Sequence, residues 1–548
     1  MVIHDTMGGR AAFVVYLYTQ LTRITEIVST VGRSEKALTV FRNDTMFFQP
    51  HSFASLDTQS DYRTPQMKAF TALLLVALLG LAAAQRFDYT AEALKDEIVD
   101  LPDAPKVNWR QFGGYINVAP GRRNFYWYVE AQSDATNKPL IFWTNGGPGC
   151  SGLIGKLTEN GPFVPHKNGT LTLREYGWNK LANIVFMEQP SGVGFSRDDN
   201  GWTLFGDDLA ATDNLAFVRG FFAKFPQYNN TDFYLASESY GGHYLPTLAL
   251  KIVKEAPELT NFRGFFVGNP LTYMPYRDFG EFASYADRQL IPRPEWDEYI
   301  AAGCRPDPNA PATNPPPVRP AACSKMESKF SQYANGFDPY ALDFPVCNSA
   351  YRAGLTERRH FLAHIRMAKL ASQVKGAFKD MSLATQGPIG KFGDSNPYFP
   401  DYDECSETWA TNYLNRKDVQ KALHADAPQA GSWQECANIN WNYDDEITAM
   451  MPIYKELISR TNGKLRMTII SGDDDAVCST QEAQLMIWNL GLKVVKPWGQ
   501  WYAENQIGGM KVKFEGLTFQ TIHGAGHMAP ATRPMQTFHA LKDYLDGK

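Results

Sequence analysis

Four short apolar runs between residues 139 and 270 constrain the fold of this chain more than any other feature. They are "PLIFW" (Pro139–Trp143), "NIVFM" (Asn183–Met187), "FYLA" (Phe233–Ala236) and "GFFVG" (Gly264–Gly268). Because polar residues do not alternate with apolar ones in them, we expect strands that are buried on both faces. Between the second and third runs, phenylalanines at four-residue spacing in Leu209–Phe225 predict an amphipathic helix. Strands and helices that alternate in this way predict an α/β fold, with a mostly parallel central sheet and helices on both faces.

From about residue 274 this alternation weakens. The segment "CRPDPNAPATNPPPVRPAAC" (Cys304–Cys323) is too rich in proline for a core element and predicts a surface loop. Strand-like runs return at "RMTIISG" (Arg466–Gly472) and "LTFQTI" (Leu517–Ile522). We therefore expect one sheet domain that is interrupted by a more helical cap insertion at about 274–450, rather than two consecutive domains.

An apolar stretch near the start, "MKAFTALLLVALLGLAAAQ" from Met67, has the layout of a secretory signal peptide. A lysine precedes the apolar residues, and small residues lie directly before Gln85, as at a cleavage site. A membrane anchor is the alternative, but the stretch is shorter than the about 20 residues that span a bilayer. We expect 67–84 to be a signal peptide, 1–66 to be a disordered gene-model extension before a true start at Met67, and 85–548 to be the mature domain.

The composition limits the binding partners, metals and cellular compartments that we expect for this protein. The net charge of −5 gives no indication of binding to nucleic acid or to an anionic membrane. An odd count of seven cysteines, in a chain that enters an oxidising compartment, predicts disulfides and one unpaired thiol. Close Cys/His clusters that would suggest zinc are absent from the sequence, and we expect no metal and no cofactor. Sequons at Asn168 and Asn229 fit a glycoprotein of the secretory pathway, either secreted or delivered to a vacuole or lysosome.

The stretch "SESYG" lies between the run ending at Ala236 and a helix-like segment, Tyr244–Val253. A strand–turn–helix of this kind is where the nucleophile elbow G-x-S-x-G occurs, the sharp turn that lifts a serine above the sheet. Ser239 is the central residue of the motif. The first glycine is replaced by Ser237, a residue small enough for the tight turn. This context predicts that Ser239 is a nucleophile.

A serine nucleophile needs a base, and the base needs an acid that orients it. In such sheets the acid and then the histidine follow the serine along the chain, on loops at strand ends. The segment "DDDAVC" follows a strand-like run and offers three candidate acids, Asp473, Asp474 and Asp475. In "HGAGHMAP" we favour His527, because a flexible glycine-rich stretch precedes it whereas His523 adjoins the strand.

Seven motifs occur in the order that is found in serine carboxypeptidases, the family of yeast and plant carboxypeptidases and lysosomal protective protein. They are "WTNGGPGCSG", "ENGPF", "EQPSGVGFS", "ESYGGHYLP", "VGNP", "SGDDDAVC" and "GAGHMAP", and the resemblance covers nearly all of 85–548. It implies an α/β-hydrolase fold for the catalytic domain. It also implies that Ser239 is the nucleophile, Asp475 the orienting acid and His527 the general base, while Asp473 and Asp474 form the loop.

The resemblance also assigns groups that contact the substrate. The amides of Gly147 and Tyr240 are expected to form the oxyanion hole. The free carboxylate of a peptide is expected to be bound by four residues: Asn145, Gly146, Glu159 and Glu238. Two adjacent carboxyls do not readily both ionise, so one retains a proton at acidic pH and can donate to a substrate carboxylate. The acid beside the nucleophile, Glu238, would then recognise C-termini at acidic pH.

By the same resemblance, the disulfides are Cys150–Cys436, Cys304–Cys323 and Cys347–Cys405. Spacing alone leaves all fifteen pairings of six cysteines open. Cys478 is then the free thiol, and it either lines the pocket for the side chain that precedes the cleaved bond or is a small buried hydrophobe.

The leading hypothesis is a serine-type carboxypeptidase that acts on the C-termini of peptides and proteins at acidic pH through an acyl-enzyme. Two alternatives stay open: an acyltransferase on the same scaffold, and a non-catalytic protective or binding protein. The presence of both Glu159 and Glu238 favours the carboxypeptidase over the acyltransferase, because the resemblance assigns these residues to binding of a peptide C-terminus. The sequence predicts no nucleic-acid or membrane partner and leaves the oligomeric state open.

Overall fold

The computed structural model describes residues 89–307, 313, 316–347 and 402–548. All of them lie in the second of two units into which the chain divides, Met1–Ala84 and Gln85–Lys548. The predicted signal peptide, the start at Met67 and the extension before it therefore lie outside the described residues. Among the residues that are described, no helix is both long and apolar enough to cross a bilayer.

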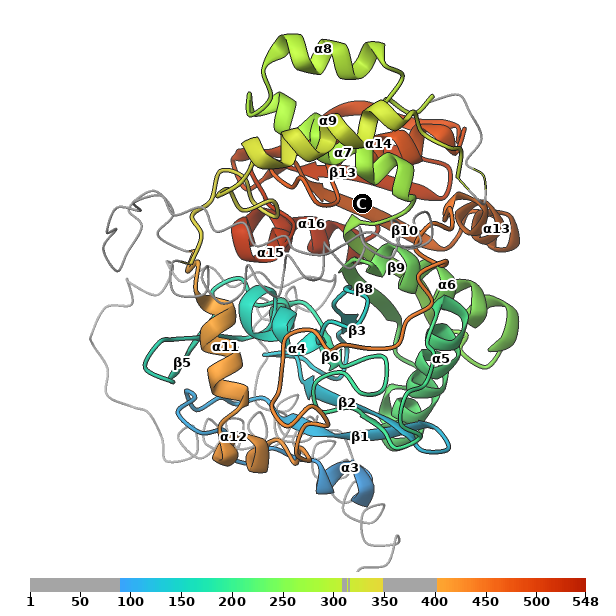
Figure 1. Cartoon of the computed structure of the whole chain (residues 1–548). Coiled ribbons are helices and arrows are strands. Elements are labelled where there is room, and N and C mark those ends of the chain that lie inside the picture. Colours follow the sequence, from blue (N-terminus) through green and yellow to red (C-terminus); the bar gives the residue numbers. More distant parts are fainter. Residues whose placement is uncertain (1–88, 308–312, 314–315, 348–401) are drawn as a thin grey trace, which may run out of the picture. The chain divides into compact units, whose positions relative to one another are not determined.

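The core of the unit 85–548 is an eleven-stranded sheet in the order β1-β2-β6-β3-β8-β9-β10-β13-β12-β11, with β7 paired to β2 (Figure 1). Six neighbouring strands in the middle are parallel: β6 (Asn183–Met187), β3 (Leu140–Thr144), β8 (Phe233–Ser239), β9 (Phe262–Pro270), β10 (Arg466–Gly472) and β13 (Leu517–Ile522). The outer strands are antiparallel: β1 (Gln111–Ala119), β2 (Arg122–Val129), β12 (Gln506–Phe514) and β11 (Val494–Ala503). The short β7 is Arg197–Asp198, and β4 (Phe163–Pro165) pairs with β5 (Leu171–Leu173) in a separate small sheet. All six apolar runs of the sequence are central strands.

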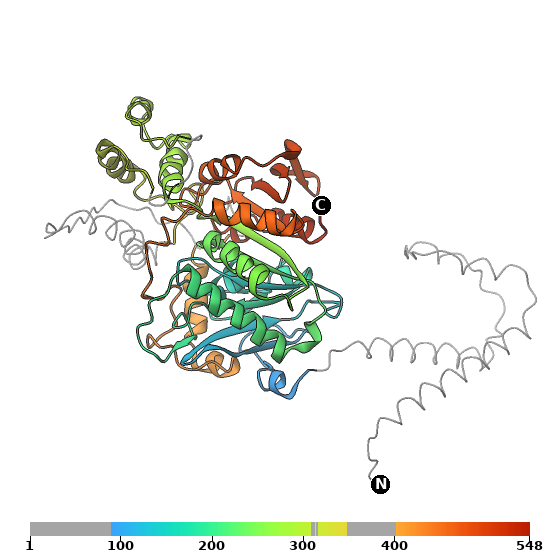
Figure 2. The ribbon, with the colours of Figure 1, turned by 90° about the vertical axis from the view of Figure 1, so that its right-hand side faces the viewer.

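Helices cover both faces of the sheet, as the alternation of apolar runs predicted. One face packs against α5 (Asp207–Lys224), α6 (Gly241–Glu255), α13 (Met451–Thr461) and α14 (Thr480–Asn489). The predicted phenylalanine stripe lies on α5 and its C-cap: Phe217 and Phe221 in the helix and Phe225 directly after it are all fully buried. The other face packs against α4 (Gly152–Ile154), the π-helical turn η1 (Gly155–Glu159), α15 (Ala529–Thr532) and α16 (Pro534–Leu545). Figure 2 shows the green helices α5 and α6 lying in front of the strands.

The regular elements described between β9 and β10 are helices, and apart from α13 they lie at two places along the sheet. The helices α7 (Met274–Asp287), α8 (Arg293–Ala301) and α9 (Ala321–Tyr333) share a small core and lie together near β10 and β13 in Figure 1. The helices α11 (Ser406–Leu414) and α12 (Lys417–Ala422) lie near the other end, where α11 contacts β4. The proline-rich stretch 304–323 already turns into helix α9 at Ala321.

Candidate active site

Ser239 lies at a sharp turn between a central strand and a helix. It is the last residue of β8, and α6 begins two residues later at Gly241. Its φ of 60° is in the left-handed region, a backbone conformation that residues other than glycine rarely adopt. A Cβ at Gly241 would overlap the hydroxyl of Ser237, so the small residues that flank Ser239 are required by the turn. This is the geometry of a nucleophile elbow, and Ser237 fits it in place of glycine.

Asp475 and His527 meet after two neighbouring parallel strands. Asp475 follows β10 and His527 follows β13, and Asp475 Oδ2 lies 2.7 Å from His527 Nδ1. Both side chains are buried, with 1% and 3% of their surface exposed. Because a carboxylate only accepts hydrogen bonds, the proton of the imidazole belongs on Nδ1, which leaves Nε2 free to accept. The structure therefore pairs the acid and the histidine in the manner that a general base requires.

Glu159 and Glu238 converge on a single amide, that of Asn145. The Asn145 Nδ2 donates to Glu159 Oε1 at 3.0 Å and to Glu238 Oε1 at 2.9 Å. Its Oδ1 accepts from Trp143 Nε1 at 2.9 Å and from the Gly155 amide at 3.1 Å. Since both donors must face an oxygen, they fix the orientation of the Asn145 side chain. The two glutamates are thus held together at the end of η1 and at the end of β8, next to Ser239.

Burial is the main influence on the pKa values of Glu159 and Glu238. Burial raises the pKa of Glu238 well above its ordinary value, and the negative charges of Glu159 and Asp475 raise it further. Burial also raises the pKa of Glu159, although the hydrogen bond from Glu238 and the positive charge of Arg174 act against this. The second oxygen of each carboxyl, Oε2, has no donor among the described residues. These effects favour retention of a proton on Glu238 to a higher pH than an ordinary glutamate would allow.

A glycine-rich loop after β3 touches the elbow. A Cβ at Gly146 would lie 2.5 Å from the Tyr240 nitrogen and 2.7 Å from the Ser239 Cβ, so only glycine allows this approach. The next residue, Gly147, has a φ of 116°, which again favours glycine. The loop therefore brings backbone amides beside the start of α6, where the Tyr240 amide lies.

Comparison with known proteins identifies the family. The sequence model of the serine carboxypeptidase family matches residues 102–547. The chain belongs to the serine carboxypeptidase family. It is 34% identical over 494 residues to serine carboxypeptidase 24 of Arabidopsis thaliana, which covers 87% of this chain and 98% of that protein. It is 35% identical over 463 residues to serine carboxypeptidase-like 26 of rice (Oryza sativa subsp. japonica), which covers 82% and 88%.

A solved structure supports the same fold. The crystal structure of Kex1(delta)p, a prohormone-processing carboxypeptidase of Saccharomyces cerevisiae, matches with a TM-score of 0.62 and 18% identity over 83% of this chain and 96% of that one. The family membership and the mostly parallel sheet together confirm the predicted α/β-hydrolase fold.

The other members of the acidic loop hold the loop in place. Asp473 accepts from the Gly524 amide at 2.6 Å and from His523 Nδ1 at 2.9 Å. Asp474 pairs with Arg288 at 2.7 Å, and burial raises the pKa of Asp474 to about 6. His523 is paired with Asp473 at the surface rather than in the site. Of the three adjacent aspartates, only Asp475 reaches His527.

One residue of this serine carboxypeptidase site, Asn269 near the end of β9, was not predicted from the sequence. Its Nδ2 donates to Asp475 Oδ2 at 2.9 Å, and its Oδ1 accepts from the Gly472 amide at 2.9 Å. Amides of Val477 and Cys478 complete the cage around Asp475, at 2.7 and 3.2 Å. The signal was the motif "VGNP", in which a buried polar residue ends a strand that pairs with β10.

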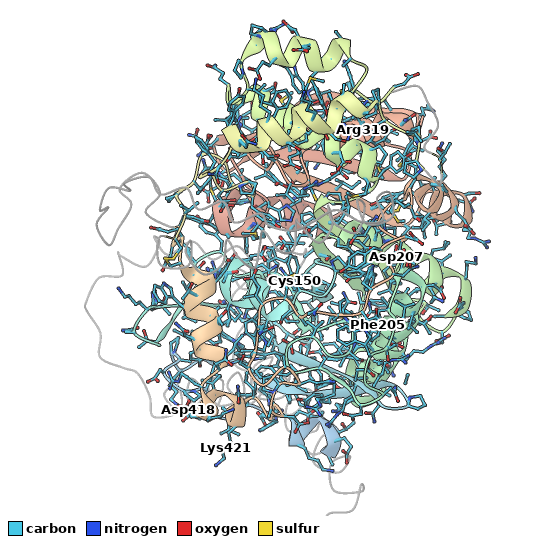
Figure 3. All side chains as sticks on the ribbon, in the orientation of Figure 1. Cys150, Phe205, Asp207, Arg319, Asp418 and Lys421 are labelled. Atoms are coloured by element: carbon cyan, nitrogen blue, oxygen red, sulfur yellow. A yellow bond between two sulfur atoms is a disulfide. The ribbon has the colours of Figure 1, made fainter. Side chains whose placement is uncertain are left out.

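Three disulfides brace the surroundings of the site. They are Cys150–Cys436, Cys304–Cys323 and Cys347–Cys405. The first ties the glycine-rich loop, in which Cys150 lies (Figure 3), to a distant segment whose Ala437 amide donates to the Gly149 carbonyl at 3.0 Å. Cys478 is free and buried, and burial raises its pKa well above the ordinary value, which favours an unreactive thiol over a thiolate. Both sequon asparagines, Asn168 and Asn229, are exposed.

Proposed function

We propose that this protein is a serine-type carboxypeptidase that releases single residues from the free C-termini of peptides and proteins at acidic pH. The observation that carries the proposal is the cluster of Glu159, Asn145 and Glu238 directly beside Ser239. A carboxyl that keeps its proton at acidic pH is a hydrogen-bond donor, and a substrate carboxylate can replace Glu159 as the acceptor of that proton. Membership of a family of serine-type carboxypeptidases supports the same conclusion.

The proposed chemistry proceeds through an acyl-enzyme. Ser239 Oγ attacks the carbonyl carbon of the last peptide bond, and His527 Nε2 accepts the hydroxyl proton while Asp475 holds the ring. The amides of Gly147 and Tyr240 stabilise the oxyanion of the tetrahedral intermediate. His527 then gives its proton to the leaving amine, and water attacks the acyl-enzyme in a second, equivalent cycle.

The same geometry explains why cleavage is confined to the last residue. The terminal carboxylate accepts from the Glu238 carboxyl and from the Gly146 amide, and from Asn145 Nδ2 after that group releases one of its two bonds to the glutamates. Glu238 directly precedes Ser239, which places the proposed carboxylate site beside the nucleophile. An endopeptidase substrate has no charge to place there and would leave a buried donor without an acceptor.

Replacing Glu238 with glutamine is expected to flatten the pH dependence of KM. In the unchanged protein the carboxyl donates only below its raised pKa, and above it the ionised carboxyl repels the substrate carboxylate, so KM rises with pH. Glutamine donates at every pH and carries no charge. At acidic pH the KM of the Glu238→Gln protein should be within about 10-fold of that of the unchanged protein. At higher pH the KM of the Glu238→Gln protein should be lower than that of the unchanged protein. Steady-state kinetics from acidic to mildly alkaline pH test this, and a parallel rise of KM in both proteins would contradict it.

The reaction itself is tested with a blocked dipeptide at acidic pH, with its C-terminus either free or amidated, and with mass spectrometry of the products. A carboxypeptidase releases the last residue from the free peptide and cleaves the amidated one about 10³-fold more slowly, because the buried donors lose their charged acceptor. An acyltransferase would instead pass the acyl group to an added alcohol. A protective or binding protein would leave both peptides intact.

We also propose that the protein passes through the secretory pathway and is secreted or delivered to a vacuole or lysosome. Three disulfides and the exposure of both sequon asparagines support this location, because disulfides persist in oxidising compartments. An acidic compartment of that pathway would also keep Glu238 protonated.

A further inference from the structure

The side chain of Tyr240 is fixed by two hydrogen bonds and by a stacked ring. Its hydroxyl donates to Asp207 Oδ1 at 3.1 Å and accepts from Trp441 Nε1 at 3.2 Å. Its ring stacks on the ring of His243, with centroids 4.7 Å apart and planes inclined by 18°. Only 1% of the residue is exposed. Because both the donor and the acceptor function of the hydroxyl are used, the ring has one orientation.

Asp207 joins this ring to a second group. Its Oδ2 lies 2.8 Å from His243 Nδ1, so one carboxylate accepts from the tyrosine and from the histidine that stacks on it. His243 is fully buried, and its Nε2 has no partner in the described part of the chain, so the bond to Asp207 fixes the imidazole. Asp207 begins α5, beside the labelled Phe205 in Figure 3, whereas His243 lies in the first turn of α6. The carboxylate therefore links the starts of two helices.

The first turn of α6 also holds the glycine-rich loop. The Gly149 amide donates to the Tyr244 hydroxyl at 3.3 Å, and the Tyr244 ring packs edge-on against Tyr240 at 5.1 Å. Both proposed oxyanion donors are thus connected to the same turn, the Tyr240 amide directly and the Gly147 amide through Gly149.

We propose that Asp207 and His243 are positioning residues that hold the Tyr240 amide in the oxyanion hole by clamping the Tyr240 side chain. The proposal rests on the proposed function in one respect, since it assumes that attack by Ser239 creates an oxyanion. Donors stabilise that oxyanion only at about 2.7–3.1 Å, and a misplacement of about 1 Å is costly. The clamp acts on the transition state and not on the carboxylate site, so its loss should lower kcat and leave KM unchanged.

The test uses Tyr240→Phe, which removes one oxygen, together with Asp207→Ala and Asp207→Asn. We expect Tyr240→Phe and Asp207→Ala each to lower kcat about 10-fold with KM within about twofold. Asparagine still offers an oxygen to the Tyr240 hydroxyl, so Asp207→Asn should retain most of the activity. The double variant Tyr240→Phe/Asp207→Ala should be little worse than Asp207→Ala, because Asp207→Ala already removes the bond to the Tyr240 hydroxyl.

The control is Asp208→Ala on the same turn of α5. The Asp208 side chain is 89% exposed and pairs with Lys251 at 3.0 Å, so its removal should change neither kcat nor KM. A second readout is the rate at which a fluorophosphonate modifies Ser239, followed by intact mass. This reaction also places negative charge in the oxyanion hole, so it should slow by the same factors as kcat.

An unchanged kcat and phosphonylation rate in Tyr240→Phe would overturn the proposal, as would effects that multiply in the double variant. If Asp207→Ala does not fold, Tyr240→Phe and Asp207→Asn decide the question alone. Failure of the proposed function gives a different result: the unchanged protein would react with the fluorophosphonate but release no residue from a peptide.

Discussion

Replacing Ser239 with alanine is expected to lower kcat/KM for a blocked dipeptide by about 10⁶-fold, the largest loss that any single substitution should cause. The φ of 60° makes Ser239 the one residue of the turn with a conformation that is disfavoured for its type. Such strain is stable only where the surrounding structure fixes it, here to present a hydroxyl above the sheet. The nearby thiol of Cys478 cannot take over, because its burial favours the unreactive protonated form.

The matched control is Ser237→Ala, two residues earlier in the same turn. Its hydroxyl makes only a weak contact, 3.4 Å from the Glu238 carbonyl, so the activity of this variant should stay within about threefold of the unchanged protein. Melting temperatures of both variants show whether the fold is kept. If Ser239→Ala retained more than about a hundredth of the activity, Ser239 would not be the nucleophile.

Replacing Asp475 with asparagine should lower kcat about 10⁴-fold while KM changes little. Three donors, from Asn269, Val477 and Cys478, point at the carboxylate besides His527. An asparagine must turn its NH₂ group toward one of these donors or toward His527. In the second case the imidazole proton moves to Nε2, and the ring can no longer accept the proton of Ser239.

The neighbouring Asp473→Asn provides the comparison. Asparagine keeps an oxygen for the Gly524 amide, and the site loses only the surface pair with His523, so kcat should fall by less than about threefold. If Asp473→Asn lost as much activity as Asp475→Asn, the assignment of the orienting acid would be wrong.

The centre of the sheet could be predicted because its strands are buried on both faces and are therefore continuous apolar runs. The outer strands could not. Strand β11 contains Pro497 and Gly499 and is largely exposed, and β1 contains two adjacent glycines, so neither shows a clear strand pattern. Their pairing depends on contacts with β12 and β2 rather than on local composition. Helix α6 also begins earlier than its apolar pattern indicated, at the glycines after the elbow.

In the candidate site, motif order indicated Ser239 and His527, and the resemblance to the family, rather than the residue pattern itself, selected Asp475 among three consecutive aspartates. The choice follows from side-chain directions, since Asp473 and Asp474 turn to His523 and Arg288. The role of Asn269 was not predicted although its motif "VGNP" was noted, because Asn269 contacts Asp475 only through the pairing of β9 with β10. The contacts of Tyr240 with Asp207 likewise join positions far apart in the chain.

The central claim, that Glu159, Asn145 and Glu238 bind the terminal carboxylate of a peptide, is tested most directly by a crystal structure. The Ser239→Ala protein, crystallised at acidic pH with a blocked dipeptide that has a free C-terminus, should trap the substrate. We expect the carboxylate within hydrogen-bond distance of Glu238 and Asn145, and the last peptide carbonyl beside residue 239. A terminal carboxylate bound elsewhere, with another part of the peptide against Glu238, would contradict the account.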